Sequence, residues 1–315
     1  MITRREYLKL SAAAGVALAI SPKRLLADDS PRALVTRAIP GTSEQLPVVG
    51  LGSSASFARV AGEGDAARIR DILQTLVREG GRVFDTAPGY GASEEVAGRV
   101  AQEAGIADRL FWATKLNVAG RGGGQADPAA ARAQLDASFA RIGKSPIDLV
   151  QVHNLGDVAT QLAILREARA AGRVRYIGLT TTFEQQYAEL ERHMREEDID
   201  FIGVDYAVDN RTMEERIFPL AQERGIGVLA YAPFGRRRLW ELVEGRTLPD
   251  WAAEHDIATW GQFFLKFVAS HPAVTVATPS TSQPRNLVDN LGAATGRMPD
   301  AAVRRRMVEY IEALG

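Results

Sequence analysis

The sequence predicts an α/β fold of the (β/α)8 barrel type, and three observations lead to it. Apolar runs rich in β-branched residues recur eight times in the 315-residue chain, beginning at residues 46, 82, 110, 147, 174, 200, 227 and 274. The spacing of about 26 to 47 residues leaves room for a strand, a helix and two loops in each unit. The runs are apolar almost throughout, as expected of strands buried on both faces of a parallel sheet.

Three further segments extend this barrel. Residues 33–47 contain the turn "PGTSEQ" and predict a hairpin that caps the barrel floor. A final helix is expected over about residues 300–313, packed on the outside. Residues 234–256, between the seventh and eighth runs, predict an insertion that overhangs the site. Its Trp240 and Trp251 either stack on a ring of the substrate or pack structurally.

The composition excludes several classes of function. Lys and Arg total 38 against 39 for Asp and Glu, so no basic excess exists to bind a nucleic acid. Cysteine is absent, which excludes disulfides and thiolate metal sites. The four histidines show no i, i+4 spacing, and no metal site is predicted.

The N-terminus has the pattern of an export signal. Arg4 and Arg5 precede the run "LSAAAGVALAI", which is too short to span a bilayer, since a span needs about 20 residues. The pattern resembles a twin-arginine signal. It predicts a signal segment over residues 1–27 and a single barrel domain over residues 33–315. The expected partner is the twin-arginine export machinery, and the expected location is periplasmic or exported, with no stable membrane span in the mature protein. The alternative is a cytoplasmic enzyme with a basic terminus.

Two glycine-rich stretches imitate the phosphate-binding turn of a doubly wound fold. They read "GLGSSA" at residues 50–55 and "GEGDAA" at residues 62–67. The first is expected to continue into about ten irregular residues, and the second does not follow a strand, whereas the true motif runs from a strand directly into a helix. A Rossmann dehydrogenase therefore stays an alternative that the strand order decides.

Four polar residues lie at or just after the ends of successive predicted strands. Asp85, Lys115 and His153 end the second, third and fourth runs, and Tyr90 follows the second. In a barrel these ends share one face, so the four side chains should converge. A nearby ammonium makes a phenol more acidic, a carboxylate keeps that ammonium charged, and a neutral imidazole can donate to a carbonyl oxygen. The group predicts carbonyl reduction, with the hydride supplied by a nicotinamide cofactor.

The motifs around these residues resemble those of the aldo-keto reductase family. They are "FDTAPGYGASEE" from residue 84, "ATK" from residue 113 and "LVQVHN" from residue 149, and the likeness covers about residues 37–295. It implies a barrel that carries out reversible, NADP(H)-dependent reduction of aldehydes or ketones to alcohols without a metal. The family's catalytic tetrad matches Asp85, Tyr90, Lys115 and His153. The alternative function is a nicotinamide-binding redox sensor or accessory protein with little turnover.

The resemblance also implies a set of cofactor contacts. Asn154 and Thr181 would contact the carboxamide of the nicotinamide. The adenosine end would lie against the segment "TPSTSQPRNLVDN" from residue 278. The full implied set is Ser53, Asn154, Thr180, Thr181, Tyr206, Tyr231, Pro233, Phe234, Gly235, Ser280, Thr281, Arg285, Asp289 and Asn290.

The chain departs from the family pattern at several of these positions. Gly203 stands where the sixth strand commonly has a glutamine, and Tyr206 is the ring expected to stack on the nicotinamide. Ser280 and Asn286 replace a lysine and an arginine that many members place against the 2′-phosphate. Arg285, one position away, could substitute, so the sequence favours NADP(H) over NAD(H).

Overall fold

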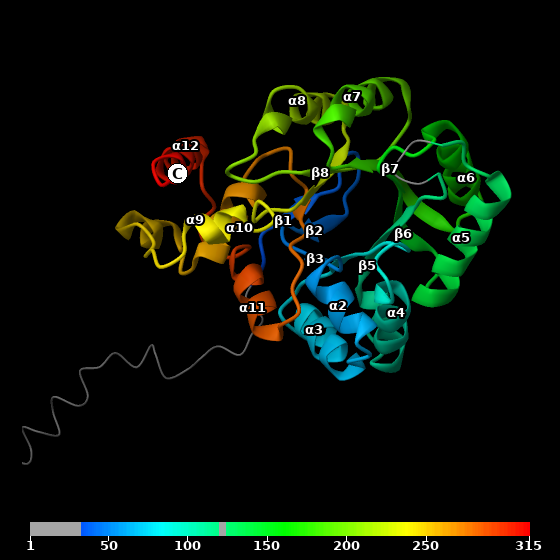
Figure 1. The fold of residues 1–315 in the computed structure, drawn as a ribbon, viewed down its shortest axis with the longest axis horizontal. Helices are drawn as coiled ribbons and strands as arrows, with labels where there is room; N and C mark the ends of the chain where they lie inside the picture. The colour runs from blue at the N-terminus through cyan, green and yellow to red at the C-terminus, as the bar shows by residue number, and fades with distance from the viewer. Residues whose placement is uncertain (1–32, 120–123) are drawn as a thin grey trace, which may run out of the picture. The chain divides into compact units, whose positions relative to one another are not determined.

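Eight parallel strands form a ring, with helices around its outside (Figure 1). The computed structural model describes residues 33–119 and 124–315. Each strand pairs with the next one along the chain, and the parallel bridges Val49–Ala277 and Gly52–Ser280 link the first strand to the last. This order confirms the predicted barrel and excludes a Rossmann sheet, in which the strand order reverses. The strands are β3 (Leu51–Gly52), β4 (Val83–Asp85), β5 (Phe111–Leu116), β6 (Ile147–His153), β7 (Val174–Thr181), β8 (Phe201–Asp205), β9 (Gly227–Tyr231) and β10 (Val276–Ala277).

Helices that surround the ring bury apolar side chains in the core around it. In α3 (Ala66–Arg78), the Asp65 side chain caps the first turn by accepting from the Arg68 amide, and Ile69 and Leu73 are buried. The other α-helices are α2 (Ser56–Gly62), α4 (Ser93–Glu103), α5 (Pro128–Ile142), α6 (Val158–Ala170), α7 (Tyr187–Glu196), α8 (Ile217–Arg224), α9 (Arg238–Leu242), α10 (Trp260–Ala269), α11 (Pro284–Gly292) and α12 (Ala301–Glu312). Short 3₁₀ turns are η2 (Ala107–Arg109), η3 (Glu184–Gln186), η4 (Thr212–Glu214) and η5 (Asp250–His255).

The start of α2 corrects one expectation. Ser56 begins a helix directly after "GLGSSA", where irregular chain was expected. The local order of strand, glycines and helix therefore does occur here, and only the strand order of the whole sheet rules out the Rossmann alternative.

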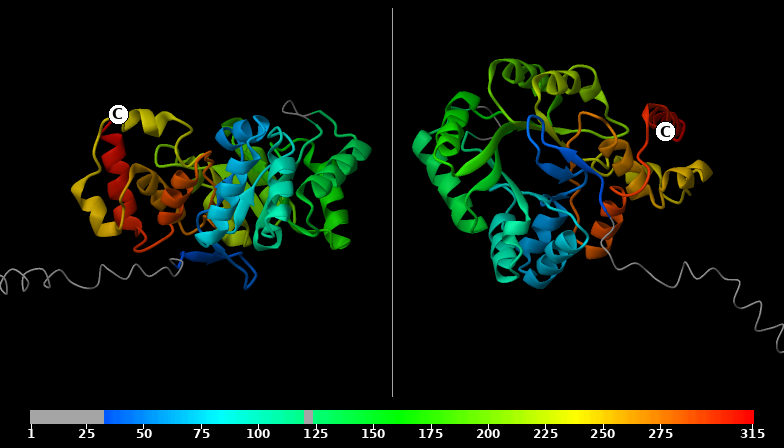
Figure 2. Two further views of the ribbon diagram at one scale, coloured as in Figure 1. Left: turned by 90° about the horizontal axis from the view of Figure 1, so that it is seen from below. Right: turned by 180° about the vertical axis from the view of Figure 1, so that it is seen from behind.

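A hairpin closes the amino-terminal end of the barrel, as predicted (Figure 2). It consists of β1 (Thr36–Ala38) and β2 (Gln45–Pro47), paired antiparallel. Its Ile39 and Leu46 pack against strand residues that point into the barrel, including Phe111 and Phe201. Part of the first apolar run thus belongs to the hairpin. The barrel strand itself begins only at Leu51.

The insertion after β9 begins at the strand ends, where its Arg236 and Arg238 line a small cavity together with Asp205, the last residue of β8. It folds into α9 and η5 beside the ring, next to α12, which is the predicted C-terminal helix (Figures 1 and 2). Trp251 packs against Tyr310 of α12, with ring centroids 6.1 Å apart, and Trp240 packs against Phe234 at 5.1 Å. Both tryptophans therefore have structural contacts with aromatic neighbours, and of the predicted overhang it is the start of the insertion that lies at the strand ends.

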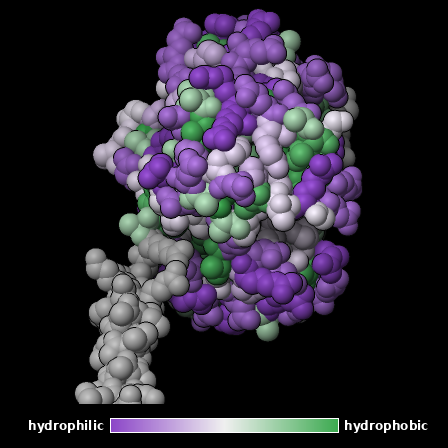
Figure 3. Space-filling model, turned by 90° about the vertical axis from the view of Figure 1, so that its left-hand side faces the viewer, coloured by the Kyte–Doolittle hydropathy of each residue, from purple (hydrophilic) through white to green (hydrophobic). Residues whose placement is uncertain are grey.

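The face that carries α9 and α12 is mainly hydrophilic, with scattered apolar residues (Figure 3). Trp240 of α9 is 42% exposed. Within residues 33–119 and 124–315, no helix has the length and apolar character to cross a membrane. The predicted signal segment lies outside these described residues.

Candidate active site

Asp85 and Lys115 form a buried ion pair at the carboxyl ends of two adjacent strands, β4 and β5. The Lys115 Nζ lies 2.9 Å and 2.8 Å from the two carboxylate oxygens of Asp85 and 2.8 Å from the carbonyl oxygen of Thr86. Burial works to lower the pKa of Lys115, but Asp85 and Tyr90 outweigh it and raise that pKa above its ordinary value. The lysine is therefore held as an ammonium ion.

Tyr90 lies next to this ammonium. The turn after β4 carries it there, with the Tyr90 amide donating to the Ala87 carbonyl at 3.0 Å and Gly91 in the left-handed region at φ 58°. The Lys115 Nζ is 5.0 Å from the centroid of the Tyr90 ring and hydrogen-bonds to Tyr90. An ammonium in this position stabilises a phenolate relative to a phenol.

His153 completes the group from the end of β6. Its ring lies edge-on to that of Tyr90, with centroids 5.9 Å apart. Tyr90 and His153 both line a cavity of about 590 Å³, whose wall also includes the amide side chains of Asn117, Gln134 and Asn154. The structure thus brings all four predicted tetrad residues together, with Tyr90 and His153 lining the cavity.

Two more polar side chains lie against the ion pair. The Tyr231 hydroxyl, from the end of β9, is 3.2 Å from Asp85 Oδ1 and 3.1 Å from Gln151 Oε1. Burial raises the pKa of Tyr231 well above its ordinary value, and the negative charge of Asp85 adds to this rise. Gln151 was not among the predicted site residues. The sequence could have identified it from the two-residue period of β6, which places Gln151 on the same face of the strand as His153.

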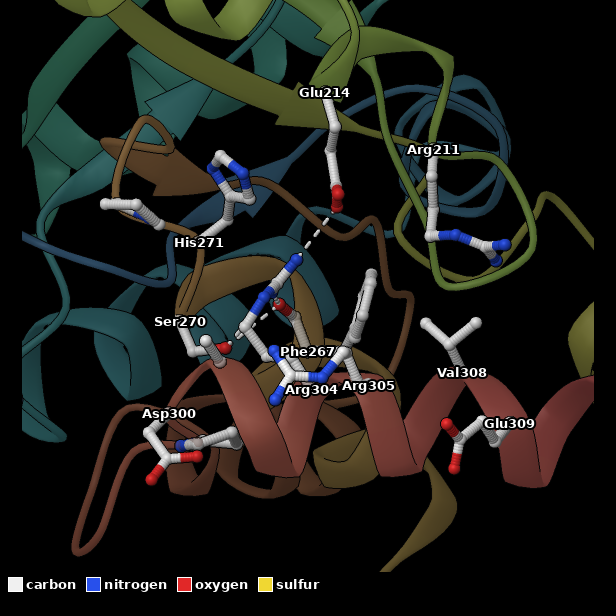
Figure 4. A pocket seen from close by; sticks show the side chains of 13 residues that line it. Arg211, Glu214, Phe267, Ser270, His271, Asp300, Arg304, Arg305, Val308 and Glu309 are labelled. Atoms are coloured by element: carbon white, nitrogen blue, oxygen red, sulfur yellow. Dashed lines mark hydrogen bonds and ion pairs between the residues drawn. The ribbon is translucent and has the colours of Figure 1, made fainter.

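Tyr206 does not reach this site, which corrects its predicted role. The ring is fully buried and packs against Phe218 and Phe267, with centroids 4.8 Å and 5.7 Å away. Its hydroxyl hydrogen-bonds to Glu214 and Arg304. These two residues line a separate cavity of about 610 Å³ between α12, α10 and η4 (Figure 4). Tyr206 is therefore part of the packing outside the barrel. Of the two tyrosines, it is Tyr231 that contacts the tetrad.

The residues expected near the nicotinamide lie at strand ends on the tetrad side. Ser53 follows β3, and its amide donates to the Asp85 carbonyl at 2.8 Å. The Asn154 amide, after β6, is 3.3 Å from the hydroxyl of Thr180 at the end of β7. The Thr181 hydroxyl hydrogen-bonds to the Gln186 side chain at 2.5 Å. The segment after β9 then supplies Pro233, Phe234 and Gly235, of which Pro233 and Gly235 are buried.

The residues expected at the adenosine end lie between β10 and the end of α11. Ser280 donates to the Ser54 carbonyl, and the Thr281 hydroxyl accepts from the Gln283 amide at 3.2 Å. Arg285 is exposed in the first turn of α11, and Asn290 is buried. The Asp289 carboxylate accepts hydrogen bonds from the Thr259 hydroxyl at 2.8 Å and the Gln262 amide at 2.9 Å. Asp289 therefore joins α11 to the start of α10.

No cluster of potential metal ligands occurs within the described ranges, 33–119 and 124–315. Lys115 and Asp85 supply a buried ammonium and a buried carboxylate at the site, and Arg141 lines the adjoining cavity. This arrangement can stabilise a charge that develops on the Tyr90 oxygen.

Known proteins resemble this chain in sequence and in fold. The chain is 27% identical over 280 residues to the aldo-keto reductase str7 of Strobilurus tenacellus, an alignment that covers 77% of this chain and 82% of the relative. Its fold is similar to that of an aldo-keto reductase from Klebsiella pneumoniae solved in complex with NADPH, with a TM-score of 0.73, 21% identity and coverage of 89% and 95% of the two chains.

A second solved structure with the same fold is the holo form of aldo-keto reductase AKR11C1 from Bacillus halodurans. Its TM-score is 0.69 at 21% identity, with coverage of 89% of this chain and 96% of that one. The model of the Aldo/keto reductase family matches residues 48–306, which include all eight barrel strands and all four tetrad residues. The chain therefore belongs to the Aldo/keto reductase family and is an NAD(P)-dependent oxidoreductase.

Proposed function

We propose that this protein transfers a hydride reversibly between NADP(H) and an aldehyde or ketone, with Tyr90 as the proton donor to the carbonyl oxygen. The observation that carries the proposal is the position of the buried Lys115 ammonium, hydrogen-bonded to Tyr90 on one side and to Asp85 on the other. When bound, the nicotinamide supplies the hydride in reduction and accepts it in oxidation.

Each tetrad residue has a separate part in moving the proton. Tyr90 gives its hydroxyl proton to the substrate oxygen in reduction and takes it back in oxidation. Lys115 stabilises the phenolate that remains, and Asp85 keeps Lys115 charged and in place. His153, across the cavity edge from Tyr90, donates a hydrogen bond to the same substrate oxygen and orients the carbonyl.

The residues at the strand ends fit a bound nicotinamide. Ser53 is fully buried beside Asp85, and its hydroxyl has no hydrogen-bond partner within the described part of the chain. An unpaired buried hydroxyl costs free energy, so a ligand that bonds to it would stabilise the site. Ser53, Asn154 and Thr181 would hold the nicotinamide end.

Two observations support NADP(H) over NAD(H). Related structures of the Klebsiella pneumoniae enzyme contain NADPH or NADP. Arg285 is exposed at the start of α11, close in sequence to Ser280 and Thr281, and a guanidinium can bind a phosphate through two N–H groups. Ser280, Thr281, Arg285, Asp289 and Asn290 would then hold the adenosine end and its 2′-phosphate.

Replacing Tyr90 by Phe tests the assignment. The change removes one hydroxyl, so kcat should fall by about 10²–10⁴-fold, the usual contribution of a general acid, while the Kd for NADPH stays nearly constant. The measurements are NADPH oxidation with a panel of aldehydes and ketones and fluorescence titration of NADPH binding.

Tyr176→Phe is the matched control. It removes a hydroxyl that donates to the Glu44 carboxylate at 3.1 Å, near the floor hairpin, and should retain full turnover. Undiminished turnover in Tyr90→Phe would contradict the proposed proton donor. Tight NADPH binding by the wild-type protein, without turnover of any carbonyl or alcohol tried, would favour a redox sensor instead.

We also propose that residues 1–27 are a twin-arginine signal and that the enzyme acts in the periplasm or outside the cell. The support is the pair Arg4 and Arg5 before a short apolar run. Cell fractionation with an antibody against the barrel measures this directly. Finding the full-length chain in the cytoplasm alone would contradict it.

A further inference from the structure

The side chain of Tyr231 reaches across the barrel to the ion pair. Its hydroxyl lies between two buried groups, 3.2 Å from Asp85 Oδ1 and 3.1 Å from Gln151 Oε1. The Lys115 Nζ is 5.3 Å from the centroid of the Tyr231 ring and 5.0 Å from that of Tyr90. The ammonium therefore lies within cation–π distance of two phenol rings, those of Tyr90 and Tyr231.

Gly203 makes this position of Tyr231 possible. A Cβ atom on Gly203, which lies on the neighbouring strand β8, would be 2.4 Å from Tyr231 Cε2 and 2.6 Å from its hydroxyl oxygen. Both distances are far below a van der Waals contact, so no side chain fits at residue 203 while the Tyr231 ring occupies this space. The glycine and the inward tyrosine form one packing arrangement.

Gln151 orients the Tyr231 hydroxyl. The Gln151 Nε2 donates to the Leu179 carbonyl at 3.3 Å, which turns Oε1 toward the phenol. Tyr231 has a single hydroxyl proton, and both of its near neighbours, Asp85 Oδ1 and Gln151 Oε1, are acceptors. The proton is thus directed into the space between them, and the Asp85 carboxylate gains a donor in addition to Lys115.

We propose that Tyr231 is a positioning residue of the tetrad, which holds the Asp85 carboxylate through its hydroxyl and so sets how strongly Lys115 acts on Tyr90. The physical reason is a competition for the ammonium. A carboxylate that accepts a second hydrogen bond carries less negative charge toward Lys115, so more of the ammonium's field remains for the phenol of Tyr90. This inference rests on the proposed function of Tyr90 as proton donor and adds the residue that tunes it.

The first test is the pH profile of Tyr231→Phe, measured in both directions of the reaction with NADPH and NADP. Without the hydroxyl, Asp85 neutralises Lys115 more fully, and the Tyr90 phenol becomes less acidic. The alkaline limb of reduction and the rising limb of oxidation should both move to higher pH, by up to about one unit. Tyr176→Phe, which loses a phenol–carboxylate hydrogen bond elsewhere in the barrel, should leave both limbs in place.

A second readout needs no turnover. Tyrosinate absorbance, titrated against pH and corrected with Tyr90→Phe, reports the ionisation of Tyr90 alone. Tyr231→Phe should raise the titration midpoint of Tyr90. Gly203→Ala, which displaces the Tyr231 ring, should raise it in the same direction. Because the two changes remove the same contact, the double variant should show little further shift.

The outcomes separate this inference from the proposed function. If Tyr90→Phe retains full turnover, the proposed function fails, but the absorbance titration still tests the coupling between Tyr231 and Tyr90. Profiles and midpoints that stay in place in both Tyr231→Phe and Gly203→Ala would overturn the inference. A weaker Kd for NADPH with an unmoved pH profile would also overturn it, because Tyr231 would then be a cofactor contact.

Discussion

At the scale of single residues, Asp85 and Lys115 depend on each other. Their side chains are at most 4% exposed, and removing one partner of such a pair leaves an unpaired charge in the interior. Lys115→Met should therefore cost about 3–5 kcal/mol of unfolding free energy and also lower kcat strongly. Urea denaturation and steady-state kinetics measure the two effects.

The double variant Asp85→Asn/Lys115→Met separates stability from catalysis. It removes both charges, so a large part of the lost stability should return, while kcat should stay low because no ammonium acts on Tyr90. Recovery of kcat together with stability would show that Lys115 has only a structural part.

At the same scale, the strand sequences predicted the tetrad residues but not the positions of Tyr206 and Tyr231. The tetrad could be predicted because Asp85, Lys115 and His153 each interrupt an apolar run at its end. The sequence could not decide whether Tyr206 or Tyr231 reaches the tetrad, because strands buried on both faces carry no hydrophobic alternation that distinguishes the barrel interior from the helix side. Tyr231 of β9 occupies the space that a side chain at Gly203 of β8 would fill, so its position depends on both neighbouring strands.

At the scale of elements, the periodic parts of the chain were predictable and the insertion was not. The C-terminal helix and the barrel strands lie where their apolar patterns placed them, except that the first run is shared between the hairpin and β3. The insertion over residues 234–256 carries apolar residues whose partners are distant in sequence, such as Trp251 against Tyr310. The path of the insertion depends on its contact with α12, and no local sequence pattern encodes that contact.

Lys266 of α10 holds the end of this insertion in place through hydrogen bonds to backbone carbonyls. The side chain is fully buried, and its ammonium donates to the carbonyl oxygens of His255 at 3.0 Å, Thr295 at 2.8 Å and Arg297 at 2.8 Å. It joins the end of η5 to the segment before α12. Lys266→Met should lower the unfolding free energy by about 1.5–3 kcal/mol, the range for hydrogen bonds to a charged group, without changing kcat.

Chemical denaturation of this variant measures the effect, and Arg246→Met is its control. Arg246 makes an exposed hydrogen bond to the Leu314 carbonyl at 3.4 Å, so its loss should cost less than about 0.5 kcal/mol. Equal stability of the two variants would contradict the role given to Lys266.

At the scale of the whole molecule, the stability of the fold should depend on pH through His271. Burial, followed by the charge of Arg304, lowers the pKa of His271 from 6.5 to about 4, while Glu214 acts in the opposite direction. Arg37 also lies close, and it donates to the His271 carbonyl at 2.8 Å. The native state therefore disfavours a protonated imidazole at this position.

The sign of the effect follows from the protons that each state binds. Between pH 6.5 and about 4 the unfolded chain protonates His271 and the native protein does not, so unfolding is favoured as the pH falls through this range. His271→Asn keeps an acceptor for the Ala273 amide, which is 3.2 Å from the His271 Nδ1, but it cannot be protonated. Thermal unfolding of both proteins across this range should show a shallower decline in Tm for the variant. Parallel curves would mean that His271 is protonated in the native fold as readily as in the unfolded chain.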